Sequence, residues 1–171
     1  MVPSLPIQIK VLDPRLLHEF GGLPMPATIG AGAVDVVACA LYPTLPNGKP
    51  DIAGRRELRE PVAVSGPQAT YVGLGFALAG PPGWAAVIIP RSGLGSARGL
   101  VLANGQGFVD IADYRGEVIA ALWNRTDEPV DVGQGERIAQ MFLVQTPTPE
   151  WTLVDELPPS VRAAGGFGST G

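Results

Sequence analysis

Short apolar runs, separated by glycine, proline and polar residues, follow one another along most of the sequence. Residues 7–12, IQIKVL, alternate apolar and polar side chains, which predicts a half-buried β-strand. Residues 32–42, GAVDVVACALY, are apolar around a single charge, as in a strand buried on both faces. Further strands are predicted within PVAV (61–64), TYVGLGFAL (70–78), WAAVIIP (84–90), LVLANGQGFVD (100–110), GEVIAALWN (116–124) and EPVDVGQGERIAQMFLV (128–144). Two of them, 100–110 and 116–124, can pair as an antiparallel hairpin.

Three other segments depart from this pattern. Residues 91–99, RSGLGSARG, favour one short helix with Ser92 as its N-cap. Residues 43–60 hold three prolines, an Asn-Gly turn signal and most of the local charge, which predicts an exposed insertion on the domain surface. From residue 147 the chain is Pro-rich and then Gly-rich. We therefore expect a β domain over residues 1–146 and a C-terminal arm over 147–171 that orders on a partner or ligand.

Composition supports an all-β domain. The 171 residues are 46% apolar and 16% charged, and include 23 glycines and 18 prolines, so the apolar segments between turns are short. Frequent breakers between short apolar runs are typical of a β-sandwich or β-barrel. The length suits one domain with a real core.

Charge and rare residues exclude several classes of function. The net charge is −4 and Lys and Arg do not cluster, which argues against a nucleic-acid groove. No apolar run approaches the roughly 20 residues of a membrane span, and the N-terminal residues lack a signal-peptide pattern, so we expect a soluble, cytoplasmic protein. The single Cys39 and single His18 cannot build a disulfide within the chain or a zinc site. We expect Cys39 to be a buried small apolar residue.

Two glycine-containing segments carry groups that suit phosphate. PRSGLG places Arg91, Ser92 and Gly93 at the predicted helix start, where backbone N–H groups, a hydroxyl and a guanidinium can hold phosphate oxygens. An ordinary capped turn with a surface arginine is the alternative. The terminal GGFGSTG combines a free backbone, hydroxyls and one ring, so it can close over a nucleotide; a disordered end is the alternative.

The segment NGQGFVDIADYRGE holds a second set of candidates. The amide of Asn104 can both donate and accept toward a nucleobase edge. Asp110 and Asp113 are three residues apart, so on a strand they point in opposite directions, and only one of them would activate a water.

Five segments occur together in a recognisable order: GAVDVVAC, PRSGLG, NGQGFVDIADYRGE, GERIAQM and RAAGGFGSTG. In order and approximate spacing they resemble the five motifs of the trimeric dUTPases, and the resemblance extends from KVLDPR to the last glycine. It implies a jelly-roll-like β-barrel with one short helix and an extended C-terminal arm, assembled as a homotrimer. It also implies hydrolysis of dUTP to dUMP and pyrophosphate, with Mg²⁺ held by the triphosphate and waters rather than directly by the protein, at sites shared between subunits.

The resemblance also assigns roles to residues. Asp110 would activate the water that attacks the α-phosphorus, and Asp35 would support the metal site without binding the ion. Tyr114 would lie under the deoxyribose and leave no room for a 2′-hydroxyl. The remaining residues implied to bind substrate are Arg91, Ser92, Gly93 and Gln140 at the phosphates, Asn104, Phe108, Val109 and Ile119 around the base, and Arg162, Phe167, Gly168, Ser169 and Thr170 in the arm.

Three features depart from the family pattern. The family's motif aspartates are usually two positions apart, whereas Asp110 and Asp113 are three apart. We therefore place one extra residue between Asp110 and Tyr114, in a β-bulge or a widened hairpin. Ala163 stands where a glycine normally follows the arm arginine, and residues 43–60 have no assigned counterpart.

Two other functions compete with dUTP hydrolysis. The dCTP deaminases share the fold, but they resemble RSS rather than RSG at residues 91–93 and carry a catalytic glutamate where this chain has Ala121. Deamination needs a proton shuttle, which argues against that reading. A regulatory protein on the same scaffold, with residues 43–60 gripping a protein partner, is the second alternative.

Overall fold

A computed structural model describes residues 5–161 and 164 of the chain, and it is mostly β with two short helices. The helices are α1 (Arg15–His18) and α2 (Ser92–Arg98). The strands are β1 (Gln8–Val11), β2 (Val34–Val37), β3 (Ala40–Tyr42), β4 (Arg56–Glu57), β5 (Val62–Val64), β6 (Thr70–Gly73), β7 (Phe76–Ala79), β8 (Trp84–Pro90), β9 (Leu100–Leu102), β10 (Gly107–Val109), β11 (Ile119–Asn124), β12 (Val130–Val132) and β13 (Arg137–Gln145).

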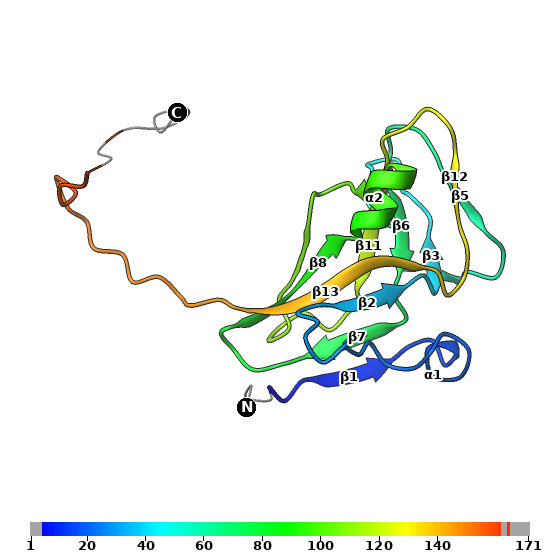
Figure 1. Cartoon of the computed structure of the whole chain (residues 1–171), viewed down its shortest axis with the longest axis horizontal. Helices are drawn as coiled ribbons and strands as arrows, with labels where there is room; N and C mark the ends of the chain where they lie inside the picture. The colour runs from blue at the N-terminus through cyan, green and yellow to red at the C-terminus, as the bar shows by residue number, and fades with distance from the viewer. Residues whose placement is uncertain (1–4, 162–163, 165–171) are drawn as a thin grey trace.

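Two larger sheets make up most of the β body (Figure 1). One has the strand order β10-β8-β13-β2, and the other has the order β4-β3-β6-β11-β9. Two smaller pairs, β1 with β7 and β12 with β5, complete the body. All the pairings are antiparallel. The all-β fold class expected from the sequence is therefore confirmed, with one helix more than predicted.

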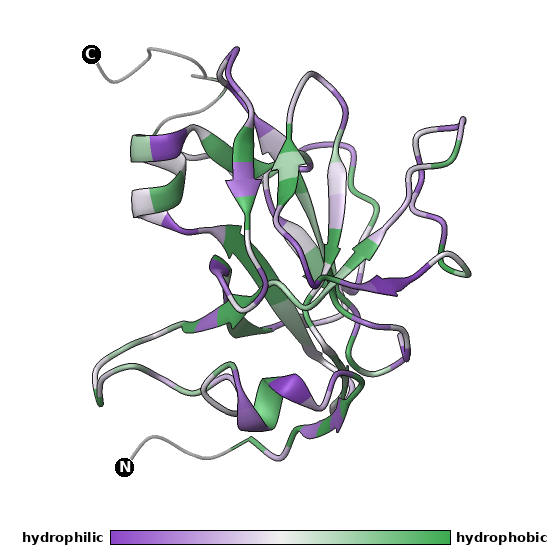
Figure 2. Cartoon of the chain, turned by 90° about the vertical axis from the view of Figure 1, so that its right-hand side faces the viewer, coloured by the Kyte–Doolittle hydropathy of each residue, from purple (hydrophilic) through white to green (hydrophobic). Residues whose placement is uncertain are grey.

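The core lies between the sheets and is built from their inward-facing side chains. Figure 2 shows apolar residues along most of the strands, and both polar and apolar residues on the connecting loops. The largest fully buried side chains are Phe76, Leu16, Leu74, Ile88, Leu100, Ile111, Leu122, Ile138, Val36, Val64, Val72 and Val118. Cys39 is fully buried among them, as predicted.

Three of the predicted strands are each divided in the structure. Residues 100–110 contain β9 and β10, which belong to different sheets, and two continuous apolar runs are divided as well. Residues 32–42 form β2 and β3, which belong to different sheets, and residues 70–78 contain β6 and the first part of β7. The break within residues 70–78 lies at Gly75, whose φ of +82° is a conformation that suits glycine. A continuous apolar run could not reveal these breaks, because both parts of it are buried.

The predicted helix is present, but its N-terminus differs from expectation. Arg91, rather than Ser92, occupies the N-cap position, and no side chain caps the helix there. Leu94 is its buried residue, and Gly99 ends it in the left-handed conformation. The other helix, α1, was not predicted; at its start the Asp13 carboxylate accepts a hydrogen bond from the Arg15 backbone N–H at 3.1 Å.

Residues 43–60 are exposed along most of their length, as predicted for a surface insertion. They are not only loop, however, because β4 pairs with β3 at the edge of the five-stranded sheet. Leu58 packs into the core and Arg55 is only partly exposed. The segment is thus attached to the body at its C-terminal end, and its suggested protein partner stays a prediction.

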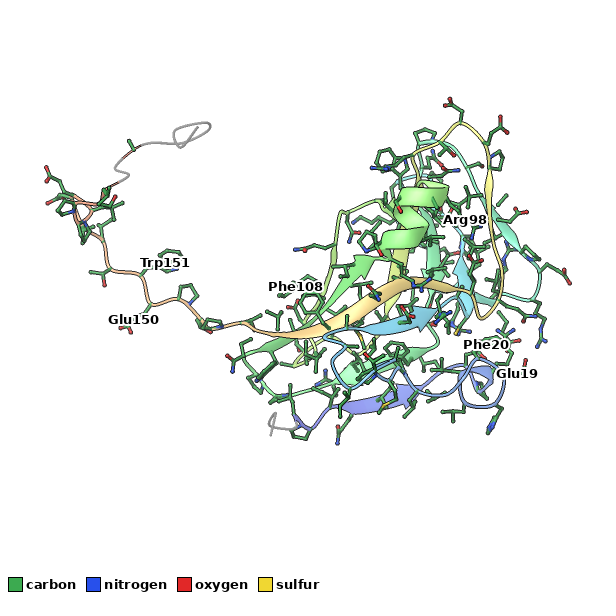
Figure 3. All side chains as sticks on the ribbon, in the orientation of Figure 1. Glu19, Phe20, Arg98, Phe108, Glu150 and Trp151 are labelled. Atoms are coloured by element: carbon green, nitrogen blue, oxygen red, sulfur yellow. The ribbon has the colours of Figure 1, made fainter. Side chains whose placement is uncertain are left out.

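Beyond β13 the chain leaves the body as an extended segment (Figure 1). Residues 147–161 are exposed, including apolar Trp151, Leu153 and Leu157. Figure 3 shows Glu150 and Trp151 on this segment, outside the body that carries Phe108. The binding of this arm to a partner or ligand stays a prediction.

Candidate active site

A pocket of about 230 Å³ opens between the edge strand β10 and the segment that leads into β11. Its wall contains six of the residues predicted to act on the substrate: Asn104, Phe108, Val109, Asp110, Tyr114 and Ile119. The volume is below the roughly 300–1,000 Å³ of pockets that enclose a drug-sized ligand. The pocket of one chain thus suits only part of a nucleoside triphosphate.

The two aspartates of this segment differ in position. Asp110 lines the pocket and Asp113 does not, although both are exposed. Between them the main chain makes one tight turn, in which the N–H groups of Asp113 and Tyr114 donate to the Asp110 carbonyl at 2.9 and 2.8 Å. The structure has this turn in place of the predicted β-bulge or widened hairpin. Within the predicted hairpin β9 does pair with β11, but β10 crosses to β8 in the other sheet.

The turn is fixed from both sides. Ile111 is fully buried, and its carbonyl oxygen accepts hydrogen bonds from the Gly80 N–H at 2.9 Å and from Arg115 Nη1 at 3.1 Å. Arg115 Nη2 also donates to the Ala112 carbonyl at 2.7 Å. The turn that accommodates the extra residue is therefore held by the buried Ile111 side chain and by hydrogen bonds to its carbonyl groups. This gives Asp110 a defined position at the pocket.

Glu117 lies in the pocket wall and was not among the predicted site residues. Its side chain is 3% exposed, and the carboxylate accepts hydrogen bonds from Tyr42 Oη at 2.5 Å, Arg55 Nε at 2.5 Å and the Gly75 N–H at 2.7 Å. Burial and the hydrogen bond with Glu117 raise the pKa of Tyr42, and the same carboxylate raises the pKa of Arg55. The sequence signal that could have identified Glu117 is a single carboxylate directly before an apolar strand, because a buried carboxylate needs hydrogen-bond donors or a positive charge beside it.

A second group of predicted residues meets around Asp35 on β2. Arg91 Nε donates to Asp35 Oδ1 at 2.9 Å, and Gln140 Nε2 donates to the same oxygen at 3.2 Å. Arg137 Nη1 approaches Asp35 Oδ2 at 3.3 Å. Asp35 and Gln140 are cross-strand neighbours, so the register of β2 on β13 makes the contact. Asp35 thus orients two of the predicted phosphate ligands, and the sequence did not single out Arg137.

Ser92 and Gly93 lie directly after Arg91, in the first turn of α2. Both are exposed, and a side chain at Gly93 would meet no atom within 4 Å. The first turn of a helix presents N–H groups that no earlier carbonyl accepts. These N–H groups, the serine hydroxyl and the Arg91 guanidinium are therefore available together on one side of the body.

The two groups of predicted residues lie far apart on one chain. Val109, next to Asp110, pairs with Ala86, whereas Arg91 follows the last residue of β8. At about 3.4 Å per residue, this stretch of strand is about 17 Å long. Asp35 lies on the opposite edge of the same sheet from β10, three strand spacings or about 14 Å away. A single chain does not bring Asp110 beside Arg91 and Gln140.

Similarity to known proteins covers both groups of residues. The family model described as dUTPase matches residues 34–171, which include the pocket and the Asp35 group. This chain belongs to the dUTPase family. Among curated relatives, deoxyuridine 5′-triphosphate nucleotidohydrolase of Hahella chejuensis is 41% identical over 164 residues and 95% of each chain. The protein of that name from Ectopseudomonas mendocina is 38% identical over 96% of this chain and 97% of its own.

Solved structures agree with the dUTPase fold. The dUTPase of Staphylococcus bacteriophage 80alpha, solved with dUPNHPP, superposes with a TM-score of 0.72 at 22% identity, and covers 98% of this chain and 99% of its own. The dUTPase of Streptococcus mutans has a TM-score of 0.62 at 21% identity over 84% of this chain and 98% of its own. At these identities the likeness concerns the fold.

The remaining predicted site residues of this dUTPase, Arg162, Phe167, Gly168, Ser169 and Thr170, lie outside the residues that the structure describes. Within residues 5–161 and 164, no group of three or more His, Cys, Asp or Glu side chains is placed to hold a metal ion. None of the helices in that part of the chain has both the length and the apolar character of a membrane span.

Proposed function

We propose that this chain hydrolyses dUTP to dUMP and pyrophosphate, and that Asp110 activates the water that attacks the α-phosphorus. The observation that carries the assignment is that Asp110 shares a pocket wall with Asn104 and Tyr114, whereas Asp113 lies outside that wall. A carboxylate held beside the bound nucleoside is within reach of a water at the α-phosphate. It takes the proton as the water attacks, and the pyrophosphate leaves.

The pocket between β10 and β11 receives the base and sugar. The amide of Asn104 and the main chain of residues 104–119 hydrogen-bond the uracil edge, and the narrow wall excludes the methyl group of thymine. Phe108, Val109 and Ile119 form the apolar part of this wall. Tyr114 lies beneath the deoxyribose. Its hydroxyl donates to the Glu117 carbonyl at 3.0 Å, which holds the ring in place and leaves no room for a 2′-hydroxyl.

The Asp35 group receives the phosphates. Arg91, Ser92, Gly93 and Gln140 present a guanidinium, a hydroxyl, backbone N–H groups and an amide, a donor set that fits phosphate oxygens. Mg²⁺ suits this arrangement when it arrives on the triphosphate, because it prefers phosphate oxygens and retained waters over side-chain cages. When bound, the ion neutralises charge that builds on the phosphates. Asp35 holds Arg91 and Gln140 in place.

Because Val109, next to Asp110, and Arg91 are separated by about 17 Å of strand in one chain, a complete site combines the pocket of one subunit with the Asp35 group of another. A homotrimer in the cytoplasm provides such sites. The exposed apolar residues Trp151, Leu153 and Leu157 support an arm that binds a neighbouring subunit. The terminal residues Arg162, Phe167, Gly168, Ser169 and Thr170 then close the site, with the ring on uracil and the polar groups on the outer phosphates.

Product analysis tests the reaction. The protein is incubated with Mg²⁺ and each deoxynucleoside triphosphate in turn, and pyrophosphate and ammonia are measured. Pyrophosphate from dUTP alone supports the proposal. Ammonia from dCTP identifies a deaminase, and the absence of both products leaves the regulatory reading.

A matched pair of variants tests the base. Asp110→Asn keeps the shape of the pocket but removes the proton acceptor, so turnover should fall by about 10²–10⁴-fold while dUTP still binds. Asp113→Asn is the control, because Asp113 lies outside the pocket wall, and it should retain near-normal turnover. Loss of turnover in Asp113→Asn with activity retained in Asp110→Asn would overturn the assignment.

A further inference from the structure

The Glu117 carboxylate is held by four hydrogen bonds beneath the pocket. Tyr42 Oη and Arg55 Nε donate to Oε2, both at 2.5 Å. The Gly75 N–H donates to Oε1 at 2.7 Å, and Arg55 Nη2 approaches the same oxygen at 3.3 Å. A carboxylate that is 3% exposed needs such compensation, and Arg55 supplies the only full positive charge among these donors.

Arg55 comes from the segment 43–60, to which neither the pocket nor the phosphate group assigns a role. The segment folds back on itself before it reaches Arg55. The Asp51 N–H donates to the Pro43 carbonyl at 2.7 Å, and the Gly54 N–H donates to the Asp51 carbonyl at 3.2 Å. A Cβ at Gly54 would lie 2.6 Å from Asp51 Oδ2, so Gly54 packs closely against the Asp51 side chain. This turn directs the Arg55 side chain, which is 26% exposed, inward to Glu117.

The sheet is also shaped around the carboxylate. A Cβ at Gly73 on β6 would lie 2.6 Å from Glu117 Oε1 and 3.0 Å from the Tyr42 ring. Only glycine leaves this space. The position of Glu117 is therefore determined by backbone on one side and by Arg55 and Tyr42 on the other, rather than by its own rotamer preference.

The position of Glu117 is transmitted to Tyr114. The Tyr114 hydroxyl donates to the main-chain carbonyl of Glu117 at 3.0 Å. A Cβ at Gly116 would lie 2.3 Å from that hydroxyl, so the ring packs directly on the backbone between the two residues. Both Tyr114 and Glu117 line the pocket. A shift of the Glu117 main chain, which carries the carboxylate held by Arg55, would therefore move the Tyr114 ring and the pocket wall that it forms.

We propose that Arg55 is a positioning residue for sugar selection: by holding Glu117, it fixes the Tyr114 ring against which the deoxyribose binds. The inference rests on the role proposed above for Tyr114. Arg55 does not line the pocket, so its removal should loosen the pocket wall rather than remove a contact with the substrate. The surface segment 43–60 thereby becomes part of what makes the enzyme selective for deoxynucleotides.

The test compares Arg55→Met with Arg56→Met, a neighbouring arginine that is exposed on β4. kcat/KM is measured for dUTP and for UTP, beside the melting temperature of each variant. We expect the dUTP/UTP ratio of kcat/KM to fall about tenfold in Arg55→Met and to stay unchanged in Arg56→Met. Arg55→Lys keeps the charge without the two-pronged contact, and should give an intermediate ratio. If Arg55→Met does not fold, Arg55→Lys decides in its place.

The dUTP/UTP ratio of kcat/KM distinguishes a positioning role of Arg55 from a role in stability alone. A lower melting temperature with a wild-type dUTP/UTP ratio in Arg55→Met would overturn the inference. Tyr114→Ala distinguishes this outcome from a failure of the proposed function. If Tyr114→Ala relaxes the ratio while Arg55→Met does not, only the role of Arg55 is wrong; if Tyr114→Ala leaves the ratio unchanged, the role of Tyr114 itself is wrong.

Discussion

The side chain of Ile111 occupies the space that any side chain at residue 80 would need. A Cβ at Gly80 would lie 2.5 Å from Ile111 Cδ1 and 2.8 Å from Ile7 Cδ1. The Gly80 N–H also donates to the Ile111 carbonyl at 2.9 Å. Because Ile111 follows Asp110 directly, this contact between strand end and turn sets the position of the proposed base.

We predict that Gly80→Ala destabilises the protein by about 1–3 kcal/mol, because the core must move to accept the methyl group. It should also lower kcat for dUTP several-fold at temperatures where the variant is folded, since the turn that carries Asp110 shifts with Ile111. Urea unfolding and steady-state kinetics measure the two effects. Gly30→Ala is the control, because a Cβ there meets nothing within 4 Å. Equal kinetics in both variants would contradict the link between Gly80 and Asp110.

Asp35→Asn should weaken catalysis through Arg91 rather than through the fold. The substitution keeps the shape of the side chain but removes the charge that holds the guanidinium at 2.9 Å. The Asp35 side chain is 18% exposed, so its ion pair with Arg91 is only partly screened by water. We expect kcat/KM for dUTP to fall about tenfold, with an unchanged circular dichroism spectrum. Asp131→Asn, an exposed carboxylate on β12, serves as the control. Wild-type kcat/KM in Asp35→Asn would show that Arg91 does not need this partner.

Deletion of residues 147–171 should leave the β body folded but reduce its activity on dUTP. Residues 147–161 are exposed and contribute nothing to the core, so the truncated chain should keep the β-type circular dichroism spectrum. We expect kcat/KM for dUTP to fall by about 100-fold or more, because the site is no longer closed against water. A fully active truncated chain would refute the role of the arm.

Light scattering of the full chain should give the mass of three 17.8 kDa subunits.

The buried Cys39 thiol should make the free energy of unfolding decrease as the pH rises above 9. Burial raises the pKa of its thiol from 9.0 to about 12, so above pH 9 the unfolded chain releases the proton while the folded chain retains it. Folding stability from this group is therefore fully present below pH 9 and is lost between pH 9 and about 12, at up to about 1.4 kcal/mol per pH unit. Urea unfolding of wild type and Cys39→Ala across this range measures the difference. Parallel stability curves for the two proteins would contradict the shift.

Sequence patterns were sufficient to locate most of the strands and to recognise the family, but they did not show where predicted strands are divided. Alternation was sufficient for β1 and a short apolar run was sufficient for β8, because each is a single strand bounded by breakers. The five motifs were sufficient for the dUTPase family, because each motif keeps its chemistry in a short stretch. The choice of Asp110 over Asp113 also came from the motif; Asp110 lies in the pocket wall, and its role as the base stays a prediction.

How these segments meet in space depends on contacts between residues distant in sequence. Sheet membership depends on partners distant in sequence, so the split of residues 32–42 between two sheets was invisible in a continuous apolar run. The extra residue before Tyr114 became a turn because Gly80 leaves room for Ile111 in the core. The bond between Arg55 and Glu117 joins residues 62 positions apart. No local pattern encodes such a contact, since it exists only once the sheets have brought both side chains to the same buried site.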